Sequence, residues 1–532
     1  MKKWFLLVAI VMVLSVSLVF AGARTDRGGT FTVALSEDIQ SLDPGTAWNF
    51  VDNQVTNQIA EGLVSFDAHS NIVPALAKSW RQVDDLTYVY DVRDDIVFSD
   101  GSRMTMDDVL FSFERARDPE GGTWFADFYA DVASFSVSGW QFTIKLGKPN
   151  AIFKFVPATG AGRIISKAHY EKVGKDKFGA PDGGVIGTGP FVYKSWSSGQ
   201  EVVLTKNTNY WNAAVRDANI IDTLVFKVIP DDTTRVIALQ NGSVDFSVNI
   251  PVTSLGTLES DKRVKLTVVG AYTMQTLGFN TQRAPMSDRS VRQAVSHALD
   301  LQNFQRNILK SAGFAGTILP FGPALYGENA ARWQAYLNTA SKYDFNLARA
   351  RELLAQSAYP NGFNATLIVS DNSLANSRAL FVQESLKQIN INVEIIRLSG
   401  EEHDNYQAGG VVDANGRRDY DMLLGGWEAD YPDIYSNVGT LLVSSQAEDG
   451  YNSAAYVNPQ VDALIEQQLR VNDAAARFEV QKQLMDIVVG DTPYIPFDYT
   501  TRQSVLNNKY TGLEISPAWL WVLPVQNIRR AQ

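Results

Sequence analysis

The order of apolar and polar positions predicts a mixed α/β chain, and the pattern is clearest between residues 187 and 246. β-rich runs within 191–204 are separated by a Ser-Ser-Gly loop at 197–199, which predicts a hairpin. A third alternating run, 224–229, ends at Pro230, because proline cannot continue a strand ladder. This part of the chain is therefore predicted to supply three strands.

A helix is predicted directly after these strands. Asp231 or Asp232 is placed to accept the free N–H groups of its first turn, and the apolar positions within 236–239 form its inner side. Gly242 can adopt the left-handed conformation that ends a helix, and 244–246 begins a fourth strand. Elements in this order are the middle of an α/β domain, which needs partner strands from elsewhere in the chain.

Residues 47–186 carry strands and helices of their own, so they are predicted to form an inserted domain. Thr105, followed three residues later by Asp108, resembles a capping box that opens a helix to Arg117. Residues 74–80 are predicted to form a short helix that ends at an aromatic residue. The pattern also predicts strands at 30–35, 88–92, 135–137 and 142–144 and a helix at 51–63.

Helices and strands alternate from residue 271 to 489, which predicts a second α/β lobe. The final segment, 493–524, is strand-like and is predicted to return to the first domain. The elements predicted in and next to this lobe are strands at 264–269, 276–280, 367–369 and 393–398, a helix at 375–389, and helices that begin after Ser287 or Asp288, after Asp344, after Asn458 and after Asp473.

These patterns predict three structural units behind a signal peptide. The predicted units are lobe I at 24–46, 187–270 and 490–532, the inserted domain II at 47–186, and lobe III at 271–489.

Residues 1–23 have the pattern of a secretory signal peptide, with two lysines, an apolar run at 4–20 and small residues at 21–23. A retained membrane anchor is the alternative, although the apolar run is marginal for a membrane span. The chain contains no cysteine, so a lipid-anchored cleavage site is excluded and no disulfide is expected. We therefore expect a periplasmic protein that is released from the membrane.

Composition argues against several classes of function. The 532-residue chain has a net charge of −11 and no basic stripe, so we expect no nucleic-acid partner. Its four histidines lie far apart in sequence, which predicts no metal site, and the chain has no nucleotide-binding loop, so no cofactor is expected. A hydrolase that uses two carboxylates stays open, but nothing singles out one pair among 58 acidic residues.

The most unusual local segment is 425–433, Gly-Gly-Trp-Glu-Ala-Asp-Tyr-Pro-Asp, which follows an apolar strand at 422–424. It is expected at the C-terminal edge of a sheet, where the ligand crevices of α/β proteins form. Trp427 and Tyr431 offer flat apolar walls, and Asp430 offers a charge for a cationic group. A capped turn that packs against its own lobe explains the same pattern.

A series of short motifs spans almost the whole chain after residue 27. They are GGT at 28–30, SLDP at 41–44, EGLV at 61–64, VPALAKSW at 73–80, FSDG at 98–101, DVLFSF at 108–113, GTGPF at 187–191, NYW at 209–211, YPNGF at 359–363, WEADYPD at 427–433 and DTPYIP at 491–496. In content and order these motifs resemble the extracellular solute-binding proteins (family 5) of oligopeptide, dipeptide and nickel ABC importers. The resemblance is much less specific for the ligand, since relatives bind peptides, oligosaccharides, opines or metal chelates.

The resemblance implies a two-lobed clamp with an extra inserted α/β domain, in which lobes I and III enclose a ligand. In peptide-binding relatives the aspartate of the matching W-x-x-D segment pairs with the peptide α-amino group, and this role transfers to Asp430. Dipeptide-binding relatives hold the carboxylate with an arginine that maps onto Arg378. Trp427 and Tyr431 are expected to shape the wall of the site, and Trp48 is expected to face it from the other lobe.

Glu428 departs from the family pattern, because peptide-binding relatives usually have a neutral residue there; its charge favours a more cationic ligand or faces water. The resemblance implies the substrate-binding component of an ABC importer, a monomer without enzymatic activity that captures short peptides by lobe closure and delivers them to a membrane permease. An oligosaccharide receptor is the main alternative, since 11 tryptophans and 20 tyrosines offer stacking platforms. A secreted hydrolase is a distant one.

Overall fold

The predicted signal peptide at 1–23 and Trp48 lie outside the residues that the structure describes. Among the helices that are described, none has both the length and the apolar character needed to cross a lipid bilayer. The computed structural model describes residues 29–47, 49–248, 250–340, 343–518 and 521–531.

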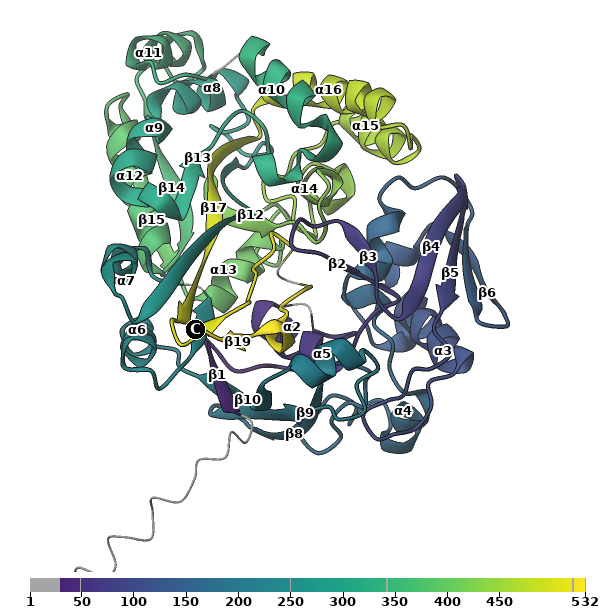
Figure 1. The fold of residues 1–532 in the computed structure, drawn as a ribbon. Helices are drawn as coiled ribbons and strands as arrows, with labels where there is room; N and C mark the ends of the chain where they lie inside the picture. Colours follow the sequence, from purple (N-terminus) through teal and green to yellow (C-terminus); the bar gives the residue numbers. More distant parts are fainter. Residues whose placement is uncertain (1–28, 48, 249, 341–342, 519–520, 532) are drawn as a thin grey trace, which may run out of the picture.

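An eleven-stranded mixed sheet extends through the molecule, which confirms the α/β class (Figure 1). Its strands are β1 (Gly29–Leu35), β8 (Phe191–Ser197), β9 (Glu201–Lys206), β10 (Ile221–Val228), β11 (Phe246–Val248), β12 (Val264–Phe279), β13 (Gly313–Ala315), β14 (Phe363–Ser370), β15 (Ile391–Leu398), β16 (Met422–Glu428) and β17 (Tyr494–Asn507). The spatial order is β15, β14, β16, β12, β17, β11, β1, β10, β9, β8, with β13 beside β17. Strand β1 lies parallel to β10 and β11, and β14 lies parallel to β15.

The predicted arrangement of residues 187–246 is confirmed. Strands β8 and β9 form the hairpin, and helix α6 (Asp232–Asn241) follows β10. The Asp231 carboxylate caps α6 by accepting a hydrogen bond from the Thr234 amide at 2.7 Å. Gly242 ends the helix with φ of 75°, a left-handed conformation that glycine adopts without a steric penalty. The partner that these strands needed is β1, which pairs with β10 along its whole length.

Two long strands connect the two ends of the large sheet. Strand β12 is continuous over 16 residues, where the sequence predicts two separate strands at 264–269 and 276–280. The prediction is wrong because β17 pairs with β12 on both sides of the expected break and satisfies its backbone groups. The pairing register shifts between Gly270 and Met274, next to the predicted boundary between lobes I and III.

Residues 47–186 contain a separate four-stranded antiparallel sheet, drawn at the right of Figure 1, in the order β4, β5, β7, β6. This part of the chain is made of α2 (Phe50–Ile59), β2 (Val64–Phe66), β3 (Ile72–Pro74), β4 (Ala77–Asp84), β5 (Thr87–Val92), α3 (Met106–Arg117), β6 (Val132–Ser138), β7 (Gln141–Leu146) and α4 (Lys167–Val173). The capping box is confirmed, since Thr105 and Asp108 exchange both hydrogen bonds at the start of α3. The helix predicted at 74–80 is wrong: pairing of β4 with β5 overrides the helix propensity of its Ala-Leu-Ala-Lys run.

Most helices follow β12 in sequence and gather in the upper part of Figure 1. They are α8 (Arg289–Ala298), α9 (Leu301–Phe304), α10 (Ala330–Thr339), α11 (Leu347–Gln356), α12 (Ser373–Lys387), α13 (Gly400–Gln407), α14 (Tyr435–Leu441), α15 (Pro459–Leu469) and α16 (Ala474–Asp491). Two six-residue helices, α5 (Ala213–Ala218) and α7 (Leu255–Ser260), precede β12. Asp288, Asn458 and Asp473 cap helices as predicted. Asp344 does not: the cap of α11 is Asn346, and the Asp344 carbonyl instead accepts a hydrogen bond from the His297 ring at 2.8 Å.

A polar cluster joins residues 47–186 to helix α15. Arg470, just after α15, donates a hydrogen bond to Asp131 Oδ2 at 2.7 Å and another to the carbonyl of Pro149 at 2.5 Å. Lys148 lies 3.2 Å from Glu466, but its side chain is 52% exposed. The Arg470 side chain is more enclosed, at 21% exposure, so it is the main polar connection here.

Replacing Arg470 with alanine should loosen this connection. Asp131 is only 8% exposed, and its carboxylate would lose the better-buried of its cationic partners. We therefore expect a larger radius of gyration for the ligand-free variant in small-angle X-ray scattering. Lys148→Ala is the matched control, because a half-exposed ion pair contributes at most about 1 kcal/mol. Superimposable scattering curves for Arg470→Ala and the wild type would show that other contacts set the distance between these parts.

Candidate ligand-binding site

The candidate site begins where β16 leaves the sheet. Strand β16 pairs with β12 up to Glu428, and the next residues turn toward the start of α14. Ser436 holds this turn: its Oγ accepts a hydrogen bond from the Asp430 amide at 2.8 Å and donates one to Asp430 Oδ2 at 3.1 Å. The Trp427 indole N–H donates to the Ser436 carbonyl at 2.9 Å. The structure thus brings together Trp427, near the end of β16, and Asp430, in the turn that follows, at the C-terminal end of this strand.

Asp430 is a half-buried carboxylate without a cationic partner among the described residues. Burial raises its pKa to about 6, and the hydrogen bond from Ser436 only partly opposes this rise. A negative charge in a partly dehydrated place is stabilised when a cation arrives. The capped-turn alternative is also visible, because Ser436 ties the same carboxylate to its own turn.

Tyr431 packs away from water against residues of 47–186. Its ring stacks on Phe155, with 6.0 Å between ring centroids and 4° between planes, and meets Phe128 edge-on at 6.1 Å. The Trp521 indole N–H, from the C-terminal segment, donates a hydrogen bond to the Asp430 carbonyl. The 427–431 segment therefore lies where parts of all three predicted units meet.

Glu428 is balanced by a positive charge. Arg502 on β17 lies 3.2 Å from its carboxylate and also stacks over the Phe50 ring at 4.5 Å. Burial lowers the pKa of Arg502, and the charge of Glu428 opposes that change. The negative charge of Glu428 is thus paired within the protein, so it neither faces water alone nor adds a free charge beside Asp430.

Arg378 forms a buried ion pair in the structure. Its guanidinium makes two hydrogen bonds to the Asp498 carboxylate, at 2.7 Å and 3.0 Å, and the Asp498 side chain is fully buried. The role of Arg378 as the anchor of a ligand carboxylate therefore stays a prediction. This role requires Arg378 to bind the ligand carboxylate together with Asp498 or in place of it. Trp48, the other predicted wall residue, lies outside the described residues.

Sequence reasoning missed Asp498 and Arg502, the two β17 residues that pair with predicted site positions. A signal was present, since both are charged residues within the strand-like segment 493–524. Their partners lie 120 and 74 residues away, so the pattern of the strand alone did not reveal what they contact.

Comparison with known proteins identifies the family of the chain. Residues 71–449 match the family described as bacterial extracellular solute-binding proteins, family 5 Middle. The chain is 28% identical over 491 residues to the glutathione-binding protein GsiB of Escherichia coli O1:K1 / APEC, covering 91% of this chain and 92% of that protein.

Two solved structures have similar folds. One is the periplasmic binding protein DppA from Helicobacter pylori in complex with the peptide STSA, with a TM-score of 0.78, 24% identity, and coverage of 95% of this chain and 99% of that one. The other is a dipeptide-binding protein from Pseudoalteromonas sp. SM9913 in complex with Met-Leu, with a TM-score of 0.80, 21% identity, and coverage of 94% and 100%.

The fold is that of a two-lobed solute-binding protein, as the sequence motifs predict. The chain belongs to the bacterial extracellular solute-binding proteins of family 5. Members of this family capture solutes for ABC importers and work with permease subunits in the membrane.

Proposed function

We propose that this protein captures short peptides with a free amino terminus and delivers them to the permease of an ABC importer. The observation that carries the proposal is Asp430, a half-buried carboxylate with a raised pKa and no cationic partner among the described residues. An α-amino group supplies the missing charge, and Trp427 beside it offers an apolar surface to a neighbouring side chain. The relatives named for glutathione and for peptides support this ligand class.

The ligand closes lobe I onto lobe III in this proposal. We propose that lobe I consists of residues 24–46, 187–270 and 490–532, that domain II is 47–186, and that lobe III is 271–489. The separate sheet of 47–186 and the register shift in β12 support this division. Closure is favourable only when a ligand contacts both faces. The protein acts in the periplasm as a monomer and catalyses no reaction.

Thermal-shift measurements test the proposed ligand class. Glutathione, Met-Leu and STSA should raise the melting temperature, because a ligand that binds only the folded state stabilises it. Cellobiose and maltotriose form the comparison panel for an oligosaccharide receptor. Stabilisation by the sugars and by no peptide would overturn the proposal, and so would chemical turnover of a bound peptide detected by mass spectrometry.

A further inference from the structure

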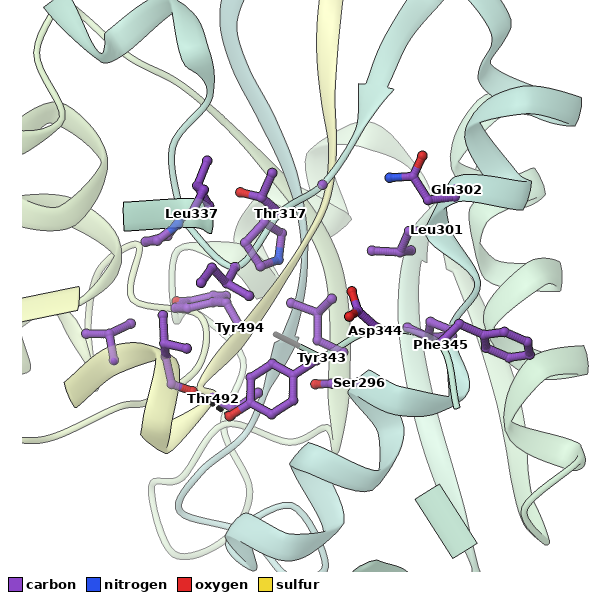
Figure 2. A pocket seen from close by; sticks show the side chains of 18 of the residues that line it. Ser296, Leu301, Gln302, Thr317, Leu337, Tyr343, Asp344, Phe345, Thr492 and Tyr494 are labelled. Atoms are coloured by element: carbon purple, nitrogen blue, oxygen red, sulfur yellow. Dashed lines mark hydrogen bonds between the residues drawn. The ribbon is translucent and has the colours of Figure 1, made fainter. Parts of the chain in front are cut away.

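An open cavity of about 600 Å³ is lined by residues of the α8–α9 connection, helix α10, the loop after β13, the end of α16 and the start of β17. Helices α8, α10 and α16 lie in the upper part of Figure 1. No residue of the 427–431 segment lines the cavity. Figure 2 shows side chains from these segments around one hollow. Cavities of roughly 300–1,000 Å³ are the size that proteins use for small molecules.

The cavity wall combines a large apolar area with acidic groups. Leu301 and Leu337 approach it from opposite sides, together with the polar side chains of Gln302 and Thr317 (Figure 2). Asp344 lines the cavity from a solvent-exposed position, and the ring of the neighbouring Phe345 points away from the other labelled side chains. Asp300 is a second carboxylate in the lining, and the described lining residues include no lysine or arginine.

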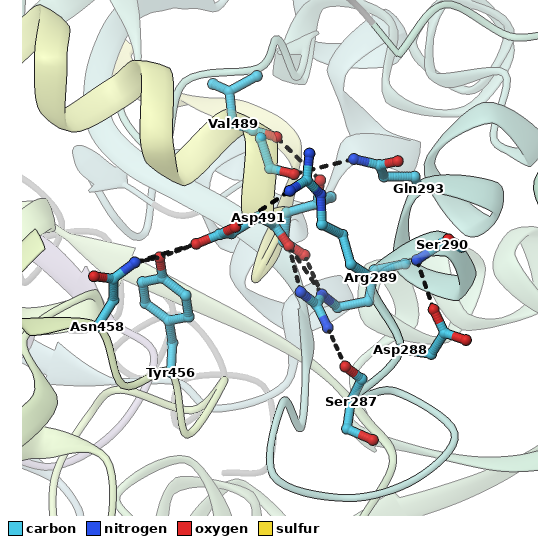
Figure 3. Close-up of polar contacts among 12 residues, drawn as sticks. Ser287, Asp288, Arg289, Ser290, Gln293, Tyr456, Asn458, Val489 and Asp491 are labelled. Carbon is cyan, nitrogen blue, oxygen red and sulfur yellow. Dashed lines mark hydrogen bonds and ion pairs between the residues drawn. The ribbon is translucent and has the colours of Figure 1, made fainter. Parts of the chain in front are cut away.

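The floor of the cavity is held in place before any ligand arrives. The Tyr343 hydroxyl donates a hydrogen bond to the Val489 carbonyl at 2.7 Å and accepts one from Thr492 Oγ1 at 2.9 Å. Figure 3 shows how the end of α16 is fixed: Asp491 accepts a hydrogen bond from Tyr456 at 2.6 Å through its side chain. The Arg292 guanidinium donates to the backbone carbonyl of Asp491 at 3.0 Å.

Tyr326 adds an aromatic ring to the wall of the cavity. It is only 7% exposed, and its ring packs against Phe321 and Trp333, with ring centroids 6.0 Å and 6.3 Å away. Its hydroxyl has no hydrogen-bond partner among the described residues and is closed off from solvent, so Tyr326 contributes its apolar ring to the site.

We propose that this cavity is a second small-molecule site, separate from the peptide site, and that it binds an organic amine with an apolar aryl or alkyl body. The apolar wall takes the body of the ligand, and Asp344 with Asp300 favours a positive charge at the edge. The absence of cationic groups among the described lining residues disfavours an anion. The site does not depend on the peptide-binding proposal, because the two share no residue.

2-Phenylethylamine and its neutral analogue 2-phenylethanol are suitable probes, measured by calorimetry and saturation-transfer NMR on the full chain. The Asp430→Asn variant is measured beside the wild type. Amine binding that is present in the wild type and absent from this variant is assigned to the peptide site. We expect 2-phenylethylamine to bind the Asp430→Asn protein with about tenfold higher affinity than 2-phenylethanol. Asp344→Asn should remove this preference, whereas Asp449→Asn, a change at an exposed aspartate outside the lining, should keep it.

Ala330→Trp provides the second arm, because Ala330 lines the cavity from an exposed position at the start of α10 and tryptophan would occupy the space. Binding of both probes should fall by more than tenfold while the circular dichroism spectrum stays unchanged. Leu337→Trp replaces this variant if it does not fold. Failure of the amine to bind the Asp430→Asn protein, or binding that survives the filled cavity, would overturn the second site. If the Asp344→Asn variant still prefers 2-phenylethylamine to 2-phenylethanol, the proposal that the cavity selects amines would be overturned.

Discussion

Asp430→Asn should weaken the binding of a peptide with a free α-amino group by about 30-fold or more, because removal of one partner from a buried charge pair costs roughly 2–5 kcal/mol. Asparagine keeps the size of the side chain and can still accept the hydrogen bond from Ser436. Titration calorimetry with whichever of glutathione, Met-Leu and STSA stabilises the wild type gives the affinity. An N-acetylated form of the same peptide should bind the wild type as weakly as the free peptide binds the variant.

The same substitution should not reduce stability at neutral pH. Burial raises the pKa of Asp430 from its usual 3.8 to about 6, so the folded protein binds this proton more tightly than the unfolded chain does. The stabilising effect of that proton is complete below about pH 4 and is lost as the pH rises through about 6. Asp430→Asn carries no such charge, so its melting temperature relative to the wild type should improve between pH 4 and 7.

The affinity of the wild type for peptide should fall as the pH falls. As the pH falls through about 6, the Asp430 carboxylate is protonated and its attraction for the α-amino group weakens. Asp430→Asn should show a flat profile, and Asp449→Asn should behave as the wild type. A variant that melts earlier and keeps its affinity would show that Asp430 acts only through its own turn.

Arg378→Ala should lower the melting temperature more than any other single change discussed here. It removes the two hydrogen bonds from Arg378 to the fully buried carboxylate of Asp498 and leaves that carboxylate only the bond from Thr500, and breaking a buried pair in this way costs about 3–5 kcal/mol. The double variant Arg378→Met with Asp498→Leu removes both charges and should recover most of the loss, because apolar replacement of a buried pair is often neutral. Differential scanning calorimetry of the three proteins measures this.

The double variant also tests the predicted contact between Arg378 and a ligand carboxylate. If Arg378 holds that group, the stable double variant should bind Met-Leu more weakly than the wild type does, and it should no longer distinguish Met-Leu from the amide of the same dipeptide. A wild type that binds the acid and the amide equally would assign Arg378 to folding alone.

The sequence by itself determined the elements whose hydrogen bonds close within a few residues. The cap of α6 by Asp231, its end at Gly242 and the box of Thr105 with Asp108 were readable because donor and acceptor are three residues apart. The motifs also placed the chain in its family and pointed to Asp430, since the segment that contains it folds as one local turn closed by Ser436.

Only the tertiary structure decided which distant groups meet. Residues 77–84 became a strand because β5 was available to pair with them, and β12 continued past its expected end because β17 lay beside it. The motifs drew attention to Arg378 and Glu428, but their partners Asp498 and Arg502 lie 120 and 74 residues away, on β17. The charge balance of the site, like the cavity beside α16, depends on long-range contacts whose geometry no local pattern encodes.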